Sequence, residues 1–594
     1  MEFDPATEVP ERESVPAEYR WNPDALFDGW DDWRREYDRV SASVDSYAAD
    51  GDPVTGAGML AETLDRYNAL HERVLVLHMY AYLHVLQDRS DDHAKTRLGE
   101  AEDLESRLED AASGIEPAIQ AMDADRLDAF CETNRLATYD RYLDDVRRQV
   151  EHTLSPETES ALAKLERPLR SPARVLDTLT NEAFDAPEVE RPDGETVAVT
   201  SHTRTRLLRH ENRTFRERVD RAFLAELAEH RHASAQAFAD HVERGVVLAD
   251  LRGYDSSLDA TLGGGFSVAA YEALVDGIRD SLDPFHRHLE QYREATDGDD
   301  LRLWDVQVSL AAGESPTIPY ERACDLAVEA VAPLGEAYQN RLAEFLDSDR
   351  VDVFETEGKQ SDMRAMNVTA DGGGSFVHLN YKNDLRSLYF FVHELGHAMH
   401  QSLYSEAQAH VNASYPGHVV EIPSFVHEAL LTDHLLSGGV DARYRDHVVE
   451  TVLGKLPLRV GAQWSSFVRA VHDAVESGEH LSAERLDELY GDVQSEFLAP
   501  VDLEPRDDHR WLVQQLSRDP HFSYRYLVGI CGALTVADRL RSGDLSSDTY
   551  RGFLRAGESE PTGALLERLD LDYASGRPVE RALDTYDRYV DELA

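Results

Sequence analysis

Phe390-Phe391-Val392-His393-Glu394-Leu395-Gly396-His397-Ala398-Met399-His400 is an apolar stretch that contains the pattern His-Glu-x-x-His. His393 and His397 are four residues apart, so on a helix both side chains lie on one face and can bind one metal ion. Glu394, beside them, can reach a water on that ion as a general base, which is typical of zinc peptidases. The alternative is a surface helix with two chance histidines. It is disfavoured because polar side chains within an apolar helix need partners, and a metal supplies one.

The segments before this stretch predict a strand followed by a helix. Asn383 and Asp384 are good N-cap residues, and apolar side chains then recur at helical spacing. The run Ser375 to Tyr381 follows a glycine-rich loop and is typical of a strand. Such a strand could pair with an extended peptide, or it could only support the helix. In the first case the substrate-binding residues are Phe376, His378 and Asn380.

A catalytic zinc needs three protein ligands, so a third must follow the helix. Several carboxylates and imidazoles are in range, and spacing alone does not rank Glu421 above Glu428 or His418. Glu421 stands where a new helix begins, near Pro423, which suits a first-turn position. The full candidate set is Glu406, His410, His418, Glu421, His427 and Glu428.

Length and composition indicate a globular protein of 594 residues with 42% hydrophobic residues. No apolar run approaches the roughly 20 residues that span a bilayer, so we expect no membrane association. The acidic N-terminus is not a signal sequence, and the three cysteines are single, which favours a cytoplasmic location.

The net charge is -54, and the acidic residues are spread along the whole chain. Lysine is nearly absent, so the positive charge is almost all arginine. This excess resembles proteins of salt-loving microbes, because molar salt shortens the Debye length to about 3 Å and screens the repulsion. It argues against nucleic acid as a partner, since phosphate binding needs a basic surface.

The order of patterns predicts a mainly α protein. A poorly ordered N-terminus, residues 1–20, precedes a helical region, residues 21–113, with a long helix from about 58 to 87. A second helical domain covers residues 114–186. The Asp-Gly turn within residues 189–199 predicts a hairpin, and residues 200–594 form the metal-binding domain.

The chain resembles the oligoendopeptidase F and thimet oligopeptidase family of zinc metallopeptidases, in the form found in haloarchaea. The resemblance rests on His393 to Gln401 and on Val420-Glu421-Ile422-Pro423-Ser424 with Glu428. It implies a large two-lobed helical peptidase with a small antiparallel β-sheet next to the zinc helix. It also implies one Zn²⁺ per chain, held by His393, His397 and Glu421, with Glu428 supporting a ligating histidine.

The same resemblance implies a late loop that contacts substrate and stabilises the oxyanion. Tyr524 and Tyr526 match two tyrosines of the family. The histidine that the family carries upstream has no direct match, and His521 or His509 could replace it. The implied substrates are short unfolded peptides that enter a channel between helical lobes, and the implied protein is a monomer or weak oligomer.

Three functions are compatible with these residues. The first is a zinc endopeptidase that cuts internal bonds of oligopeptides. The second is a zinc carboxypeptidase of similar helical build, which would need a group that binds the terminal carboxylate. The third is a non-catalytic peptide-binding protein, which is disfavoured because it would not require Glu394 together with every ligand.

The charge yields a first prediction, that the protein unfolds at a higher temperature in concentrated KCl than in dilute buffer. Repulsion between like charges destabilises the compact state at low salt, and concentrated salt screens this repulsion. Thermal unfolding followed by circular dichroism across a KCl series tests it. A lower unfolding temperature in concentrated KCl would contradict it.

Overall fold

The computed structural model describes residues 9–47, 54–296, 300–360, 365–514, 516 and 520–593. The chain forms two compact units, each built from three separate segments. Unit 1 contains Met1–Val150, Ser315–Ala442 and Val536–Leu571, and unit 2 contains Glu151–Glu314, Arg443–Thr535 and Asp572–Ala594. Each unit combines segments that are far apart in the sequence, so the units do not correspond one to one to the consecutive domains expected from the sequence. Those domain boundaries stay a prediction.

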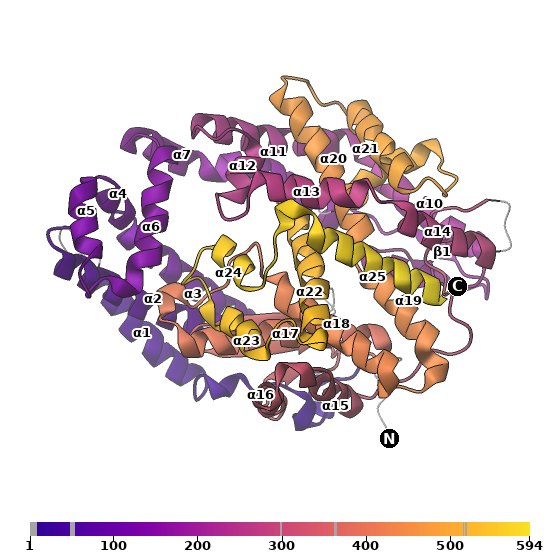
Figure 1. The fold of residues 1–594 in the computed structure, drawn as a ribbon, viewed down its shortest axis with the longest axis horizontal. Coiled ribbons are helices and arrows are strands. Elements are labelled where there is room, and N and C mark those ends of the chain that lie inside the picture. Colours follow the sequence, from indigo (N-terminus) through magenta and orange to yellow (C-terminus); the bar gives the residue numbers. More distant parts are fainter. Residues whose placement is uncertain are drawn as a thin grey trace. The chain divides into compact units, whose positions relative to one another are not determined.

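Unit 1 is mainly helical and holds the larger of the two sheets (Figure 1). Its elements are α1 (Trp30–Tyr47), α2 (Ala57–Gln87), α3 (Asp92–Ala112), α4 (Ile115–Gln120), α5 (Ala124–Cys131), α6 (Asp140–Arg148), α15 (Tyr320–Ala330), α16 (Glu336–Leu346), β3 (Val351–Asp352), β4 (Ala365–Ala370), β5 (Gly374–Leu379), α17 (Leu385–Ala407), α18 (Glu421–His434), α23 (Ser547–Ala556) and α24 (Thr562–Arg568).

Tryptophans anchor the first helix of unit 1. Trp33 is fully buried, and its indole N–H donates to the carbonyl oxygen of Leu77 on α2 at 2.9 Å. The Trp30 ring lies 4.9 Å from that of Tyr80, centroid to centroid. The long helix α2 ends at Gln87, as expected from its apolar spacing.

Residues 9–20, which were expected to be poorly ordered, form 3₁₀ helices at Arg12–Ser14 and Ala17–Tyr19, while residues 1–8 lie outside the described part. Arg12 Nη2 lies 2.5 Å from Oδ2 of the buried Asp352. Asp352 also pairs with the fully buried Lys359 at 2.6 Å. Burial favours the neutral acid, but Lys359 and Arg12 lower the pKa of Asp352 to about 2.

The sheet of unit 1 has the strand order β3-β5-β4. β4 and β5 are antiparallel, with Ala365 opposite Leu379, and β3 adds a short parallel pairing through Val351 and Val377. The sheet is therefore mixed rather than purely antiparallel. β5 pairs with β4 along its length and with β3 at Val377 and His378, so of the two interpretations of residues 375–381 the structure favours a strand that supports the helix.

Unit 2 consists of helices and a two-stranded hairpin (Figure 1). The helix α22 (Tyr524–Ser542) begins in unit 2 and ends in unit 1. The other elements are α7 (Pro156–Leu169), α8 (Ser171–Asp177), β1 (Glu188–Glu190), β2 (Thr196–Ala198), α9 (Ser201–Leu207), α10 (Arg213–Glu229), α11 (Arg231–Leu251), α12 (Ser257–Leu262), α13 (Val268–Arg279), α14 (Asp283–Ala295), α19 (Arg445–Lys455), α20 (Leu458–Glu476), α21 (Ala483–Phe497) and α25 (Arg577–Leu593).

The predicted hairpin is confirmed, because β1 and β2 are antiparallel with Glu190 opposite Thr196, and Gly194 in the turn has φ 90°. The core of unit 2 is aromatic around Phe238, which stacks between Phe467 and Trp511 at centroid distances of 6.3 Å.

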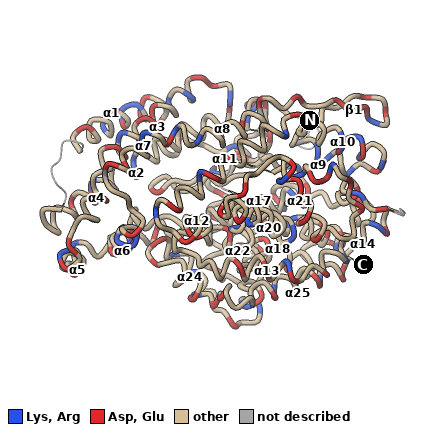
Figure 2. The backbone as a smooth tube through the Cα atoms, turned by 90° about the horizontal axis from the view of Figure 1, so that it is seen from above, with Lys and Arg blue, Asp and Glu red and all other residues tan. Residues whose placement is uncertain are grey.

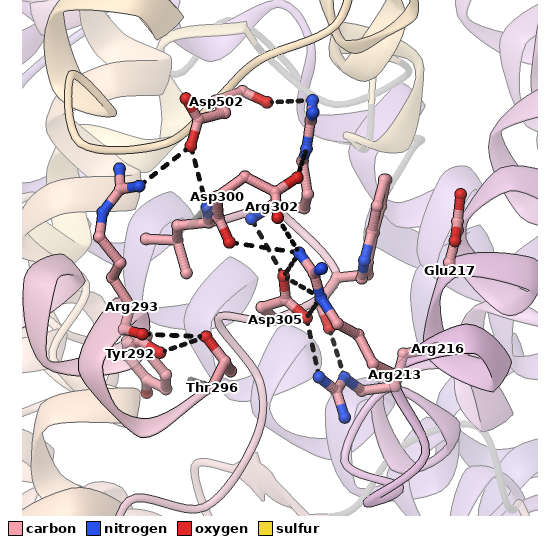
Figure 3. A network of polar contacts seen from close by, with 12 residues as sticks. Arg213, Arg216, Glu217, Tyr292, Arg293, Thr296, Asp300, Arg302, Asp305 and Asp502 are labelled. Atoms are coloured by element: carbon pink, nitrogen blue, oxygen red, sulfur yellow. Dashed lines mark hydrogen bonds and ion pairs between the residues drawn. The ribbon is translucent and has the colours of Figure 1, made fainter. Parts of the chain in front are cut away.

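A buried aspartate ties the loop before α15 to α10 (Figure 3). Asp305 is fully buried and accepts hydrogen bonds from Arg213 Nη2 at 2.8 Å, Arg216 Nη2 at 2.7 Å and the backbone N–H of Arg302 at 3.1 Å. The network continues outward through Asp300, Arg302 and Asp502. Its inner carboxylate is thus fully compensated, as a buried charge must be.

Aspartate and glutamate positions are spread along the backbone rather than gathered in one segment (Figure 2). Many arginines are held in ion pairs with them, such as Arg279 with Glu496 at 2.6 Å and Arg204 with Asp220 at 2.9 Å. No helix in the described residues is long and apolar enough to cross a membrane.

The Figure 3 network yields a stability prediction. Asp305→Asn leaves the buried Arg216 without its carboxylate, which should cost about 3–5 kcal/mol of unfolding free energy. Asp300→Asn, at a side chain 39% exposed, should cost about 1 kcal/mol or less. Denaturant unfolding at one fixed KCl concentration measures the unfolding free energy of both variants. Equal losses would show that the burial of Asp305 does not determine its contribution to stability.

Candidate functional site

The helix α17 brings the two motif histidines together. Asp384 caps it, accepting a hydrogen bond from the Ser387 N–H at 2.6 Å, where the sequence predicted the helix start. Its apolar side chains are buried in unit 1, whereas His393 and His397 keep about 15% and 14% of their side chains exposed. The two imidazoles lie with ring centroids 5.0 Å apart.

A glycine lets the next helix approach α17 closely. A Cβ added at Gly396 would lie 2.5 Å from Ser424 Cα and 2.8 Å from the Pro423 carbonyl oxygen. No real side chain tolerates such distances to backbone atoms, so this contact requires glycine. It holds the first turn of α18, which carries Glu421, against α17.

Glu421 completes a cluster with the two histidines. Its Oε2 is 3.3 Å from His393 Nε2 and 3.8 Å from His397 Nε2. One ligand atom from each residue lies within 4.8 Å of the others, and no other group of three or more such residues meets this condition in the described part of the chain. Two imidazoles and a carboxylate are the donor set of a catalytic zinc site, so these residues fit a metal ion.

Glu428 supports the cluster from two turns further into α18. Its Oε1 accepts a hydrogen bond from His393 Nδ1 at 2.7 Å, which leaves Nε2 facing Glu421. Burial opposes a charge on His393, but hydrogen bonds to Glu421 and Glu428 raise its pKa to about 10. Burial lowers the pKa of His397 to about 4. The carboxylates therefore stabilise positive charge at this place, as a metal site requires.

Three of the other candidate ligands, Glu406, His410 and His427, have partners outside the cluster. Glu406 is bound to Arg341, and His410 donates to Asp371 Oδ2 at 2.9 Å. His427 is fully buried and shares a hydrogen bond of 2.7 Å with the Tyr338 hydroxyl. His400, to which the sequence assigned no chemistry, stacks on Phe553.

One residue near the site was missed by sequence reasoning. Tyr415 lies in the turn before α18 and stacks on His400. Burial raises the pKa of its hydroxyl, and so do the charges of Glu421 and Glu394. The available signal was its place, six residues before Glu421 in a Tyr-Pro turn.

Comparison with known proteins decides the family. A family model described as peptidase family M3 matches residues 206–585, and a model described as oligopeptidase F matches residues 119–185. The chain belongs to peptidase family M3. Oligopeptidase PepF of Bacillus subtilis (strain 168) is 26% identical to it over 600 residues, covering 99% of this chain and 88% of that protein.

Solved structures share the fold of this M3 peptidase. A putative peptidase from Chlamydophila abortus has a TM-score of 0.85 at 22% identity and covers 99% of both chains. Oligoendopeptidase-F from Enterococcus faecium has a TM-score of 0.71 at 22% identity and covers 96% of this chain and 99% of its own. The predicted family and mainly helical fold are confirmed.

The strand residues expected to bind substrate lie inside the M3 fold. Phe376 and His378 are fully buried, and Asn380 is 6% exposed. His378 Nε2 and Asn380 Nδ2 both donate to the carbonyl oxygen of Gln360, at 3.0 and 2.9 Å. These hydrogen bonds brace the segment before β4, and substrate binding by the three residues stays a prediction.

The late-loop residues belong to unit 2, and their roles stay predictions. Tyr524 is fully buried, with its ring 5.7 Å from Tyr271 and 5.9 Å from Phe266. His521 is also buried, with its ring 4.2 Å from His472. Tyr526 is only half-buried and is the more accessible of the two tyrosines.

The contact between α17 and α18 at Gly396 yields a prediction for the cluster of His393, His397 and Glu421. Gly396→Ala should cost about 1–3 kcal/mol of stability, because the methyl group pushes α18 from α17. It should also weaken Zn²⁺ binding by about tenfold or more, because Glu421 moves with α18. Competition with a chromophoric chelator measures the affinity.

Gly99→Ala is the matched control, because Gly99 lies in α3 with nothing within 4 Å of an added Cβ. It should stabilise the protein by up to about 1 kcal/mol and leave Zn²⁺ affinity unchanged. Unchanged Zn²⁺ affinity in Gly396→Ala would show that the helix contact does not position Glu421.

Proposed function

We propose that this M3 peptidase is a zinc-dependent endopeptidase that hydrolyses internal bonds of short peptides. The observation that carries the proposal is the convergence of His393, His397 and Glu421 within 4.8 Å, with Glu394 next to the first ligand in sequence. These three residues would hold one Zn²⁺ per chain. When bound, Zn²⁺ acts as a Lewis acid that polarises the scissile carbonyl group and makes water more acidic.

Glu394 is the group that moves the proton. The residue is 9% exposed, so it is largely withdrawn from solvent. As a general base it takes a proton from the attacking water onto a carboxylate oxygen. It then gives that proton to the leaving amine nitrogen, which completes hydrolysis.

Glu428 and the edge of the sheet position the reactants. The hydrogen bond from His393 Nδ1 to Glu428 fixes the imidazole tautomer, so that Nε2 stays available for the metal. Since β5 is the central strand, we assign pairing with an extended peptide to β4, which is at the edge of the sheet in the described residues. Tyr526, Tyr524 or His521 would stabilise the oxyanion from the late loop.

Charge and cysteine chemistry support the remaining parts of the proposal. A net charge of -54 opposes binding to nucleic acid or to an anionic membrane. Cys131, Cys324 and Cys531 are free, which fits a reducing cytoplasm. We propose a cytoplasmic monomer or weak oligomer that acts on unfolded peptides.

An internally quenched peptide of about ten residues, assayed in concentrated KCl, tests the reaction directly. Internal cleavage that stops with a chelator and returns with Zn²⁺ is the expected result, with the cut position read by mass spectrometry. Trimming from the C-terminus would instead identify a carboxypeptidase. Peptide binding without any cleavage by the zinc-loaded protein would identify a binding protein.

Glu394→Gln should lower kcat by about 10²–10⁴-fold, because the general base is lost. Zinc content, measured by mass spectrometry, and peptide affinity should stay unchanged. Glu428→Gln is the contrast, because it should lower Zn²⁺ affinity by about 10–100-fold and recover activity in excess zinc. A Glu394→Gln protein with full kcat would exclude this residue as the base.

A further inference from the structure

Unit 2 contains a large cavity, and apart from His521, which lines it, the proposed chemistry uses none of its residues. Its volume is about 1070 Å³, and it is lined by α7, α8, α11 and α12, with one wall from α20. The helices α7, α11 and α12 run along one side of unit 2 in Figure 1. Small-molecule sites usually measure about 300–1,000 Å³, so this cavity is larger than a single inorganic ion needs.

The cavity is basic in a strongly acidic chain. The chain has 114 acidic and 60 basic residues, yet the lining has five arginines and only two carboxylates. The carboxylates are Glu166 and Asp177. The arginines are Arg167, Arg170, Arg174, Arg244 and Arg252.

Two of the five arginines are neutralised by carboxylates. Arg170 pairs with Glu166 at 2.6 Å. Arg252 forms a two-pronged pair with Glu159, with distances of 2.7 and 2.9 Å. These two guanidinium groups are already used by the fold, so they add little to binding.

The other three arginines have no carboxylate within 4.0 Å in the part of the chain that the structure describes: Arg167, Arg174 and Arg244. Arg174 Nη2 donates only to the carbonyl oxygen of Arg167, at 3.2 Å. Arg244 Nε is buried and has no hydrogen-bond partner among the described residues. Arg167 and Arg174 are exposed and Arg244 is half-buried, so their guanidinium groups are accessible to an anion, with which they can form charge-assisted hydrogen bonds.

The inner wall is suited to more than a hydrated ion. His472 is 5% exposed, and its Nδ1 shares a hydrogen bond of 2.8 Å with Ser257 Oγ. Its Nε2 is buried without a hydrogen-bond partner in the described residues. Val242, Leu248 and Ala249 add apolar surface beside it. The site therefore combines cations with aliphatic side chains, as a peptide would require.

We propose that this cavity binds the carboxylates of acidic peptides. Guanidinium groups bind carboxylates through paired hydrogen bonds, which favours them over lysine here. The surface of a chain with net charge -54 repels such peptides, and a local basic cavity offsets that repulsion. The inference rests on the proposed function, because it takes peptides as the ligands.

The test compares two fluorescent peptides of about ten residues, one rich in Asp and Glu and one with Asn and Gln instead. The protein is the full chain with Glu394→Gln, so that bound peptide is not cut. Fluorescence anisotropy gives each Kd at one fixed KCl concentration. The parent should bind the acidic peptide about tenfold or more tighter than the neutral one.

Arg167→Gln with Arg244→Gln should remove that preference by weakening the acidic peptide about tenfold, with little change for the neutral peptide. Arg206→Gln with Arg209→Gln is the matched control, since both side chains are exposed in unit 2 and lie outside the cavity. The control changes net charge equally and should alter either Kd by less than about twofold.

Three outcomes would overturn the proposal. They are an unchanged Kd in the cavity variant, an equal loss in the control, and full displacement of the acidic peptide by an equal concentration of inorganic phosphate. The last would assign the arginines to a small inorganic anion. Cleavage of the neutral peptide by the wild-type protein tests the proposed function separately, because that readout does not involve the cavity arginines.

Discussion

The close contact of backbone with backbone at Gly396 is the constraint on which the functional geometry of unit 1 depends. The main chain of α18 lies where a side chain on α17 would be, so the spacing of the two helices is set by atoms that cannot adjust their rotamers. The first turn of α18 then places Glu421 beside the imidazoles of α17, and Glu428, two turns further on, contacts the other ring nitrogen of His393. One contact thus holds both glutamates against the histidines of α17.

What the sequence predicted well was local. The start of α17 at Asp384, the length of α2 and the Asp-Gly hairpin follow from capping, periodicity and turn chemistry within a few residues. The third member of the cluster could not be ranked in this way, because Glu421 is brought to His397 by packing and not by spacing. The place of β5 was missed for a related reason, since its second neighbour, β3, is only two residues long and leaves almost no pattern.

Buried residues of the site were also hard to predict. His378 and Asn380 alternate on a strand in a manner typical of an exposed polar face, but both turn inward to the carbonyl oxygen of Gln360. Tyr415 carried no periodic signal, and its stacking on His400 follows from the fold of the turn. Ion pairs were equally hard to predict from the sequence. Only the structure distinguishes an arginine that is paired with a carboxylate, such as Arg216, from the arginines of the unit 2 cavity that are unpaired among the described residues.

The way the chain supplies its positive charge has a practical consequence for labelling. Only five lysines occur, and Lys359 is sealed inside unit 1 by Asp352 and the carbonyl oxygens of Phe354 and Leu379. Lysine amines are the usual targets of acetylation, ubiquitin-like tagging and amine-reactive dyes. This protein therefore has very few amines that can react in this way. Reagents directed at guanidinium groups would map its surface far more completely.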